Sequence, residues 1–243
     1  MGLSRNPPTL LVTRPEPDGS ALAAEAEARG WRPVAAPLMR IAPLDASVVI
    51  RAGESLAFTS ANGVRVFAQK RPERALTVFC VGPASADVAR AAEFEDVRTA
   101  GGDVEALASL IAEARLGPVI HIGGVDRAGD LVGELTRLGV EARREDVYKA
   151  EEVSALSEAA LEAIGRGEPG RVWVALFSPR TARIFERATA AQDLGRLGAA
   201  CLSANVAAAL ERRERYNRVA IAAAPSTDAL LAAAEAEIAA GGL

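Results

Sequence analysis

Short turns that combine hydroxyl, amide and glycine residues follow several strand-like runs of the sequence. Two of them read Thr59-Ser60-Ala61-Asn62-Gly63 and Ser178-Pro179-Arg180-Thr181. A small hydroxyl residue here can cap the next helix and leave its first backbone N–H groups free to hold an anion. Similar turns recur at Gly82-Pro83-Ala84-Ser85, Gly123-Gly124, Ser203-Ala204-Asn205 and Pro225-Ser226-Thr227. Capping alone explains any one turn, whereas the recurrence predicts a shared polyanion site.

The sequence lacks the residues that several other kinds of functional site require. The chain has one histidine, His121, which argues against a Ser-His-Asp triad or a histidine-rich metal site. The glycine patterns of dinucleotide-binding turns and P-loops are absent, and a lone glycine pair is more often simple turn geometry. Cys80 and Cys201 lie far apart in apolar stretches without a second nearby cysteine, so we interpret both as core residues.

The composition is that of an ordinary globular protein. Half of the 243 residues are apolar and a quarter are charged, with a net charge of −4. Lysine and arginine form no basic block, so we expect no nucleic-acid partner. No apolar run approaches the roughly 20 residues that span a bilayer, and the first residues do not resemble a secretory signal. We therefore expect a cytoplasmic protein without membrane contact.

The elements that must position these turns alternate along the chain. Short β-branched runs are followed by longer amphipathic runs, which is typical of βα units on parallel sheets. The clearest predicted strands are Thr9–Thr13, Ser55–Thr59, Thr77–Val81, Val119–Ile122, Val172–Phe177, Ala199–Leu202 and Arg218–Ala222. The clearest predicted helices are about Gly19–Arg29, Val104–Ala114, Gly129–Leu138, Thr181–Ala191 and Thr227–Ala239.

An internal repeat divides the chain into two similar halves. Four blocks recur: LLVTRPEPDGS with IHIGGVDRAGD, FTSANGVRVF with FSPRTARIF, CVGPASADVARAAE with CLSANVAAALERRE, and TAGGDVEALASLIAEA with AAAPSTDALLAAAEAEI. This pattern predicts duplication of one α/β unit. Ligands of such open sheets bind where the strands end, so we expect the turns of two lobes to face a shared cleft. The helix-free stretches Pro33–Leu44 and Arg144–Val153 are predicted to pair as the hinge.

Several short strings together resemble the uroporphyrinogen-III synthase family. They are VTRP at Val12–Pro15, FTSANGVR at Phe58–Arg65, VG and small residues at Val81–Ser85, IGG at Ile122–Gly124, VYKA at Val147–Ala150, and FSP at Phe177–Pro179. The resemblance covers nearly the whole chain. It implies two α/β lobes with open parallel sheets, joined by a two-stranded β connection. One lobe would comprise residues 1–36 with 151–243, and the other residues 37–150.

The resemblance also implies a reaction. The family closes hydroxymethylbilane, a linear tetrapyrrole with eight carboxylates, to uroporphyrinogen III with inversion of the last ring, ring D, and loss of water. No cofactor or metal takes part in that reaction. Helix N-termini and local arginines act at short range, so a net-negative protein can hold such a polyanion. A monomer is expected, with transient contact to the preceding pathway enzyme as a further possibility.

Site residues follow from matching the family's turns. Tyr148 in VYKA is the candidate proton donor to the departing hydroxyl, whose loss gives an azafulvene; the other tyrosine, Tyr216, has no comparable setting. Packing in a strand is the alternative role for Tyr148. Carboxylate contacts are assigned to Thr59, Ser60, Asn62, Gly63, Gly82, Ser85, Gly123, Gly124, Ser178, Ser203 and Arg14. Ser203 stands where the family turn would contain glycine, and Arg14 could instead pair with a nearby acid.

Two other classes of function share the two-lobed pattern. A non-catalytic binding protein that closes on a small polyanionic ligand would show the same repeat and hinge. A nucleotide-sugar transferase also has two α/β lobes, although the chain is short for one. Turnover of the ligand, or binding of a nucleotide, would separate these hypotheses from the synthase.

Overall fold

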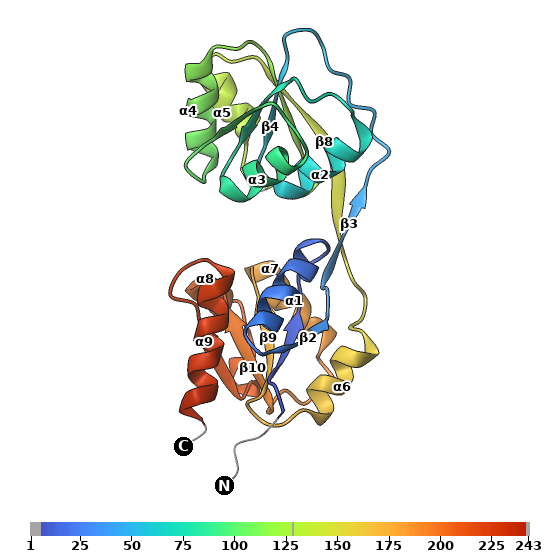
Figure 1. Ribbon diagram of the computed structural model, residues 1–243, viewed down its shortest axis with the longest axis vertical. Helices are drawn as coiled ribbons and strands as arrows, with labels where there is room; N and C mark the ends of the chain where they lie inside the picture. Colours follow the sequence, from blue (N-terminus) through green and yellow to red (C-terminus); the bar gives the residue numbers. More distant parts are fainter. Residues whose placement is uncertain (1–5, 128, 242–243) are drawn as a thin grey trace. The chain divides into compact units, whose positions relative to one another are not determined.

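The computed structural model describes residues 6–127 and 129–241, which form two compact units. Unit 1 combines the residues up to Arg40 with those from Glu151 onward, and unit 2 runs from Ile41 to Ala150. Figure 1 shows the blue N-terminal elements among the orange and red C-terminal ones of unit 1. The chain therefore leaves unit 1 after its first two strands, builds all of unit 2, and returns.

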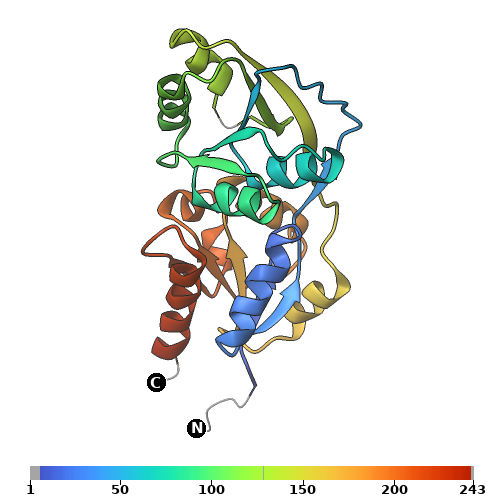
Figure 2. The same cartoon turned by 45° about the horizontal axis from the view of Figure 1, so that its top comes forward.

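The sheet of unit 1 is parallel, with strand order β11-β10-β9-β1-β2. Its strands are β1 (Thr9–Val12), β2 (Arg32–Ala35), β9 (Val172–Leu176), β10 (Leu197–Cys201) and β11 (Arg218–Ile221). The helices are α1 (Asp18–Ala28), α6 (Glu158–Arg166), α7 (Pro179–Ala188), α8 (Ala204–Ala208) and α9 (Thr227–Ala240), with a short 3-10 turn at Arg213–Arg215. Figures 1 and 2 show these helices flanking the sheet.

The sheet of unit 2 has the order β3-β8-β7-β4-β5-β6. Its strands are β3 (Met39–Pro43), β4 (Ser55–Phe58), β5 (Thr77–Cys80), β6 (Asp96–Thr99), β7 (Val119–Gly124) and β8 (Ala142–Glu152). The helices are α2 (Ala61–Lys70), α3 (Pro83–Ala91), α4 (Val104–Ala114) and α5 (Leu131–Arg137). From β8 to β6 the neighbouring strands are parallel.

The repeat found in the sequence is confirmed by the order of the strands. The matched blocks place β7 with β1, β4 with β9, β5 with β10, and β6 with β11. Read in this correspondence, β6-β5-β4-β7-β8 is the same order as β11-β10-β9-β1-β2. Cys80 and Cys201 end β5 and β10, and both are fully buried, as predicted. The predicted fold class, two similar α/β lobes with open parallel sheets, is thus confirmed.

Strands β3 and β8 carry the chain between the units. Leu44 N donates to Val147 O at 2.9 Å, and Val153 N donates to Leu38 O at 3.0 Å. Residue numbers rise along one strand as they fall along the other, so the pair is antiparallel. The prediction that Pro33–Leu44 forms this connection is wrong at its start. Pro33–Ala35 belong to β2, where Val34 and Ala35 pair with Leu11 and Val12 of β1 and extend the parallel sheet by an edge strand.

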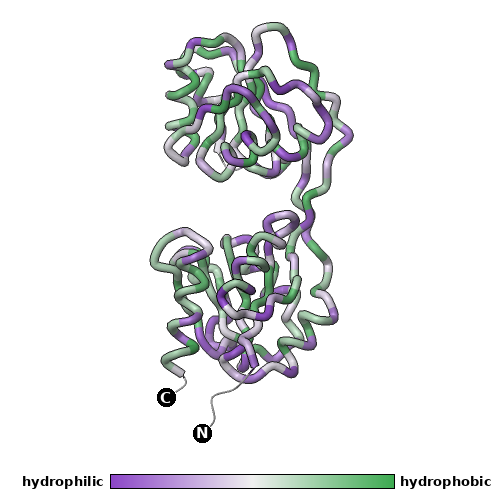
Figure 3. Tube along the Cα trace, viewed as in Figure 1, coloured by the Kyte–Doolittle hydropathy of each residue, from purple (hydrophilic) through white to green (hydrophobic). Residues whose placement is uncertain are grey.

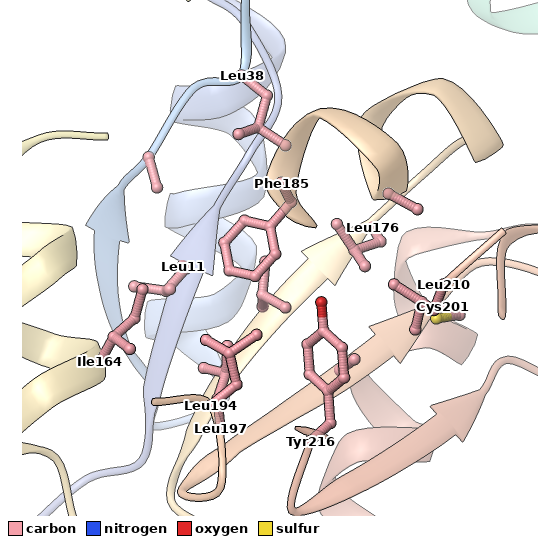
Figure 4. Close-up of a cluster of buried hydrophobic side chains, with 14 of the residues drawn as sticks. Leu11, Leu38, Ile164, Leu176, Phe185, Leu194, Leu197, Cys201, Leu210 and Tyr216 are labelled. Carbon is pink, nitrogen blue, oxygen red and sulfur yellow. The ribbon is translucent and has the colours of Figure 1, made fainter. Parts of the chain in front are cut away.

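Each sheet buries apolar side chains on both faces, because successive strand residues point to opposite sides. In unit 1, Leu11 packs with helices α6, α7 and α8, while Leu10 and Val12 pack with α1 and α9. Figure 4 shows the first of these clusters around Phe185 and Ile164. In unit 2, Leu56 and Phe58 face α2 and α3, and Ala57 faces α4 and α5. Figure 3 shows helices in which green apolar and purple polar stretches alternate, as packing on one face requires.

The helix ends follow the predicted signals. Gly30 and Gly139 have φ of +82° and +75°, which is the left-handed conformation that glycine adopts at a helix stop. Serine caps open α2, α6, α7, α8 and α9, and aspartate caps open α4 and α5. Within residues 6–127 and 129–241, no helix has the length and apolar character needed to cross a bilayer.

Candidate active site

The polar turns of unit 2 gather where the parallel strands of its sheet end. This side of the sheet, formed by the carboxyl ends of the strands, is called the carboxyl edge. Strands β4, β5, β6 and β7 are parallel, and each is followed by a helix, so the four turns lie at the carboxyl edge. The N-termini of α2, α3, α4 and α5 therefore point their partial positive charges to the same edge. This arrangement suits an anionic ligand.

A chain of hydrogen bonds crosses three neighbouring strands at this edge. The Arg144 Nη1 group lies 3.2 Å from His121 Nδ1, and His121 Nε2 lies 3.0 Å from Thr59 Oγ1. Arg144 belongs to β8, His121 belongs to β7, and Thr59 directly follows β4; these three strands are neighbours in the sheet. Alternation explains their meeting, because Thr59, His121 and Arg144 share the sheet face of Ala57, Val119 and Ala142.

The chemical nature of the three side chains determines which atom donates in each of these hydrogen bonds. A guanidinium group only donates, so Arg144 donates to His121 Nδ1. Burial and, next, the positive charge of Arg144 lower the pKa of His121 to about 4, while the charge of Asp146 opposes this shift. At neutral pH the ring is therefore uncharged and carries its one proton on Nε2. His121 Nε2 donates that proton to Thr59 Oγ1.

Arg144 holds two other groups besides His121. Its Nε donates to Asp146 Oδ1 at 2.7 Å, and its Nη2 donates to the carbonyl oxygen of Gly124. The side chain of Arg144 is 15% exposed, so these charge-assisted bonds are partly shielded from water. Arg144 thereby ties β8 to Gly124, the last residue of β7.

Gly123 and Gly124 are required by the side chains that lie on them. An added Cβ at Gly123 would come within 2.8 Å of the Arg144 guanidinium, and one at Gly124 within 2.6 Å of the Tyr148 ring. Neither glycine has a positive φ, so close approach and not backbone conformation explains them. The sequence assigned this pair to carboxylate contacts, and the structure adds a role in seating Arg144 and Tyr148.

A β-bulge places Tyr148 opposite Gly124. Gly123 pairs with Asp146, whereas Gly124 pairs with Tyr148, so Val147 is the extra residue on β8. Regular alternation would put Tyr148 on the face of Arg144 and Asp146, but it packs with the cluster that faces α2 and α3. Bulges commonly re-aim a side chain near a functional site. Here the bulge brings the half-buried phenol to the end of β7.

The second tyrosine occupies a different environment. Tyr216 is 6% exposed within the core of unit 1, and its ring is enclosed by apolar side chains (Figure 4). Its hydroxyl has no hydrogen-bond partner among the described residues, and burial raises its pKa above the normal range of a phenol. Tyr216 cannot reach a ligand, so Tyr148 is the tyrosine available for chemistry.

The other predicted residues of unit 2 have structural contacts. Ser60 caps α2 by accepting from Asn62 N at 3.2 Å, and Asn62 Oδ1 accepts from Arg65 Nη1 at 2.9 Å. Gly63 lets α2 approach β7, since an added Cβ would lie 3.1 Å from Ile122 O. Ser85 is buried and donates to Gly82 O at 2.9 Å, which turns its hydroxyl inward at the start of α3.

In unit 1 the predicted residues lie at the carboxyl edge of their own sheet. Ser178 and Thr181 form a reciprocal capping box at α7, and Ser203 caps the five-residue helix α8. Arg14 pairs with Asp18 at 2.5 Å and lies 5.0 Å from the centre of the Phe177 ring. Pairing with a nearby acid, the alternative role for Arg14, is thus present in the structure.

His121, Arg144 and Asp146 were not predicted as site residues. The histidine was noted only for the chemistry that one histidine excludes, although a polar residue between Ile120 and Ile122 in a buried strand was a usable signal. Arg144 was counted within the hinge. Within residues 6–127 and 129–241, no group of three or more His, Cys, Asp or Glu side chains is placed to hold a metal ion.

Comparison with known proteins identifies a family. A model described as uroporphyrinogen-III synthase HemD matches residues 20–232. The solved structure of uroporphyrinogen-III synthetase from Helicobacter pylori is similar with a TM-score of 0.67 at 15% identity, covering 95% of this chain and 99% of that one. A mutant uroporphyrinogen III synthase from Thermus thermophilus gives 0.51 at 16% identity, covering 96% and 98%. No curated protein is similar enough in sequence to count as a relative.

Proposed function

The chain belongs to the uroporphyrinogen-III synthase HemD family, and we propose that the carboxyl edge of unit 2 holds its catalytic group. The proposed reaction, which the family resemblance implies, cyclises hydroxymethylbilane to uroporphyrinogen III with inversion of ring D and loss of water. The chain is thus a lyase-type enzyme of tetrapyrrole biosynthesis. The family match favours this activity over the non-catalytic binding protein.

Tyr148 is the proposed proton donor to the hydroxyl that leaves the bilane. The observation that carries this proposal is the contrast between the two tyrosines: one phenol is half-exposed at the sheet edge, and the other is sealed in a core. As the C–O bond of the hydroxymethyl group breaks, the phenol donates a hydrogen bond or its proton to the departing oxygen, which leaves as water. The azafulvene that remains is the electrophile for ring closure.

Most of the acceleration is proposed to come from positioning. Holding the bilane so that its inverted terminal ring meets the azafulvene turns a rare encounter into the preferred one. Helix N-termini and the turn residues of both units are the proposed carboxylate contacts: Thr59, Ser60, Asn62, Gly63, Gly82, Ser85, Gly123, Gly124, Ser178, Ser203 and Arg14. Ser85 and Arg14 are the weakest of these, since Ser85 is buried with its hydroxyl on Gly82 O and the charge of Arg14 is paired with Asp18.

The cellular location and the oligomeric state of the enzyme are proposed from its cysteines and its surface. Both cysteines are free and fully buried, which fits the reducing conditions of the cytoplasm. A monomer is proposed because the exposed large apolar residues found in the described part of the chain are scattered singly. Any contact with the preceding pathway enzyme would be transient.

Product analysis tests the proposed function. Hydroxymethylbilane is generated fresh and incubated with and without the protein, and the oxidised uroporphyrin isomers are then separated by chromatography. We expect a shift from the spontaneous type I isomer to type III. An unchanged type I product from folded protein would overturn the enzymatic function and leave the polyanion-binding protein as the better hypothesis.

A further inference from the structure

The hydrogen-bond chain that ends at Thr59 has a consequence for what this edge can bind. His121 Nε2 donates to the Thr59 oxygen, so the hydroxyl of Thr59 must point its own hydrogen elsewhere. No further hydrogen bond of that hydroxyl is found among the residues that the structure describes. Thr59 is half-buried, directly before the Ser60 cap of α2. Its O–H therefore remains available to a ligand at the carboxyl edge.

We propose that Arg144, acting through the neutral ring of His121, fixes the Thr59 hydroxyl as a hydrogen-bond donor to one carboxylate of the substrate. This inference rests on the proposed function. The His121 N–H occupies one acceptor position of the Thr59 oxygen and directs the hydroxyl hydrogen away from the ring, so Thr59 keeps its donor role. A carboxylate only accepts, so it matches this donor. His121 and Arg144 are positioning residues here, since neither needs to contact the substrate.

The surroundings of His121 support a fixed direction. Arg144 and Asp146 face the ring from β8, Arg127 and Asp130 lie beyond the end of β7, and Thr59 approaches from β4. The bond between Arg144 and Asp146 holds the guanidinium in place. A reversed chain would require Arg144 to accept a hydrogen bond, which a guanidinium cannot do.

The Thr59 hydroxyl is tested with a pair of variants. Thr59→Val removes the hydroxyl and keeps the shape, so we expect KM for hydroxymethylbilane to rise about tenfold or more while kcat changes little, because a hydrogen bond to a charged group is lost. Thr59→Ser keeps the hydroxyl and should restore KM to within about threefold of the wild-type value. An unchanged KM in Thr59→Val would overturn the proposal.

The role of His121 is tested with three replacements. Glutamine can place an N–H near the Nε2 position and still donate to Thr59, whereas asparagine keeps an acceptor for Arg144 but falls short of Thr59. We expect KM to rise least for His121→Gln and more for His121→Asn and His121→Leu. A role in stability alone would not rank the KM values in this order, and equal KM values for all three would contradict the proposal.

A double-mutant cycle separates action through Thr59 from an independent effect. If His121 acts through Thr59, KM of the double variant Thr59→Val with His121→Leu should equal that of Thr59→Val alone. Independent contributions would instead multiply the fold-changes. Should the His121 variants fail to fold, the Thr59 pair still decides whether this hydroxyl binds the substrate, and an unchanged KM in Thr59→Val overturns the proposal.

Thr13→Val is the matched control from unit 1. The Thr13 hydroxyl is buried and donates to Ala175 O, so its loss should lower the melting temperature and leave KM unchanged. The two possible failures are distinguishable. A wild-type protein that forms no type III isomer overturns the proposed function, whereas a wild-type enzyme with normal products and an unaffected Thr59→Val variant overturns only this inference.

Discussion

The two units share a strand order but use the polar groups at their carboxyl edges differently. In unit 1 these groups are occupied internally: Ser178 and Thr181 cap one another, Thr13 donates to Ala175 O, and Arg14 pairs with Asp18. In unit 2 the Thr59 hydroxyl is left as a directed donor, and a tyrosine lies on a glycine. The duplication thus preserved the scaffold while the edge chemistry diverged.

Two strands of unit 2 account for the different polar groups at the carboxyl edges. Strand β1 reads Thr-Leu-Leu-Val, and the strand in the same place of unit 2, β7, carries His121 in its centre. β8 is also longer than its counterpart β2, and its extra length contains Asp146, the bulge and Tyr148. A packed scaffold constrains the apolar positions, and the polar residues at strand ends are free to change.

The largest expected effect concerns stability at acidic pH. His121, which lies in unit 2, should make the free energy of unfolding depend on pH. The unfolded histidine binds a proton below about pH 6.5, while the folded one binds it only below about 4. Between these values the unfolded chain holds more protons, so the free energy of unfolding falls as the pH falls from 6.5 to 4. The loss approaches roughly 3 kcal/mol by pH 4, since each pKa unit is worth about 1.4 kcal/mol.

Urea unfolding of the wild-type protein and His121→Gln at several pH values checks this expectation. Glu54, Glu73 and Asp96 also have lowered pKa values, mainly through hydrogen bonds from arginines, and they destabilise both proteins on acidification. The difference between the two curves therefore isolates His121. Parallel curves between pH 6.5 and 4 would show that the histidine is not held neutral.

The next largest effect should come from crowding the seat of Tyr148. Gly124→Val places a side chain where the Tyr148 ring lies, with even the Cβ only 2.6 Å from a ring carbon. The ring must move by the order of an ångström, and such a displacement costs about 100-fold in kcat. Steady-state kinetics with hydroxymethylbilane measures the change.

Gly123→Val is the matched control for Gly124→Val. Its Cβ would come within 2.8 Å of the Arg144 guanidinium, which has no proposed role in proton donation, so we expect a smaller loss of kcat. Equal losses in the two variants would argue against a special role for the Tyr148 seat.

A smaller effect is expected from removing the Tyr148 hydroxyl itself. Tyr148→Phe should lower kcat by about 10- to 100-fold without abolishing turnover, because positioning still operates when proton donation is lost. Initial rates of type III formation measure this. Undetectable activity in a folded variant, or an unchanged rate, would each count against this mechanism.

Tyr216→Phe makes the same change in the other unit. It removes a buried hydroxyl that has no hydrogen-bond partner among the described residues, so activity should be unchanged and stability equal or higher by up to about 1 kcal/mol. A loss of activity here would break the contrast between the two tyrosines.

Much of the fold could be predicted from local pattern. Runs such as Ser55–Phe58 and Val172–Leu176 are apolar throughout and bounded by turn residues, as strands buried on both faces are. Strand β2 was missed because Pro33 suggested a connecting segment. Its place at the edge of the sheet tolerates proline, since the unpaired side of an edge strand needs no N–H.

The candidate site was predictable only in part. Turn hydroxyls follow from helix-capping rules, and the capping roles of Ser60, Ser178 and Ser203 are confirmed. The meeting of Thr59, His121 and Arg144 was not predictable, because it joins residues 62 and 23 positions apart through the neighbour order β4-β7-β8. Nothing local marks Arg144 as a partner of the histidine.

The sequence by itself determined the alternation of elements, the duplication, the buried cysteines and the family, because periodicity, repeats and motifs are local properties. Only the tertiary structure decided which hydroxyls are used internally and which face outward, and which tyrosine is buried. These outcomes depend on strand neighbours and on one extra residue in β8. Pairing across strands brings distant residues within hydrogen-bond distance, and no property of the separate segments specifies that distance.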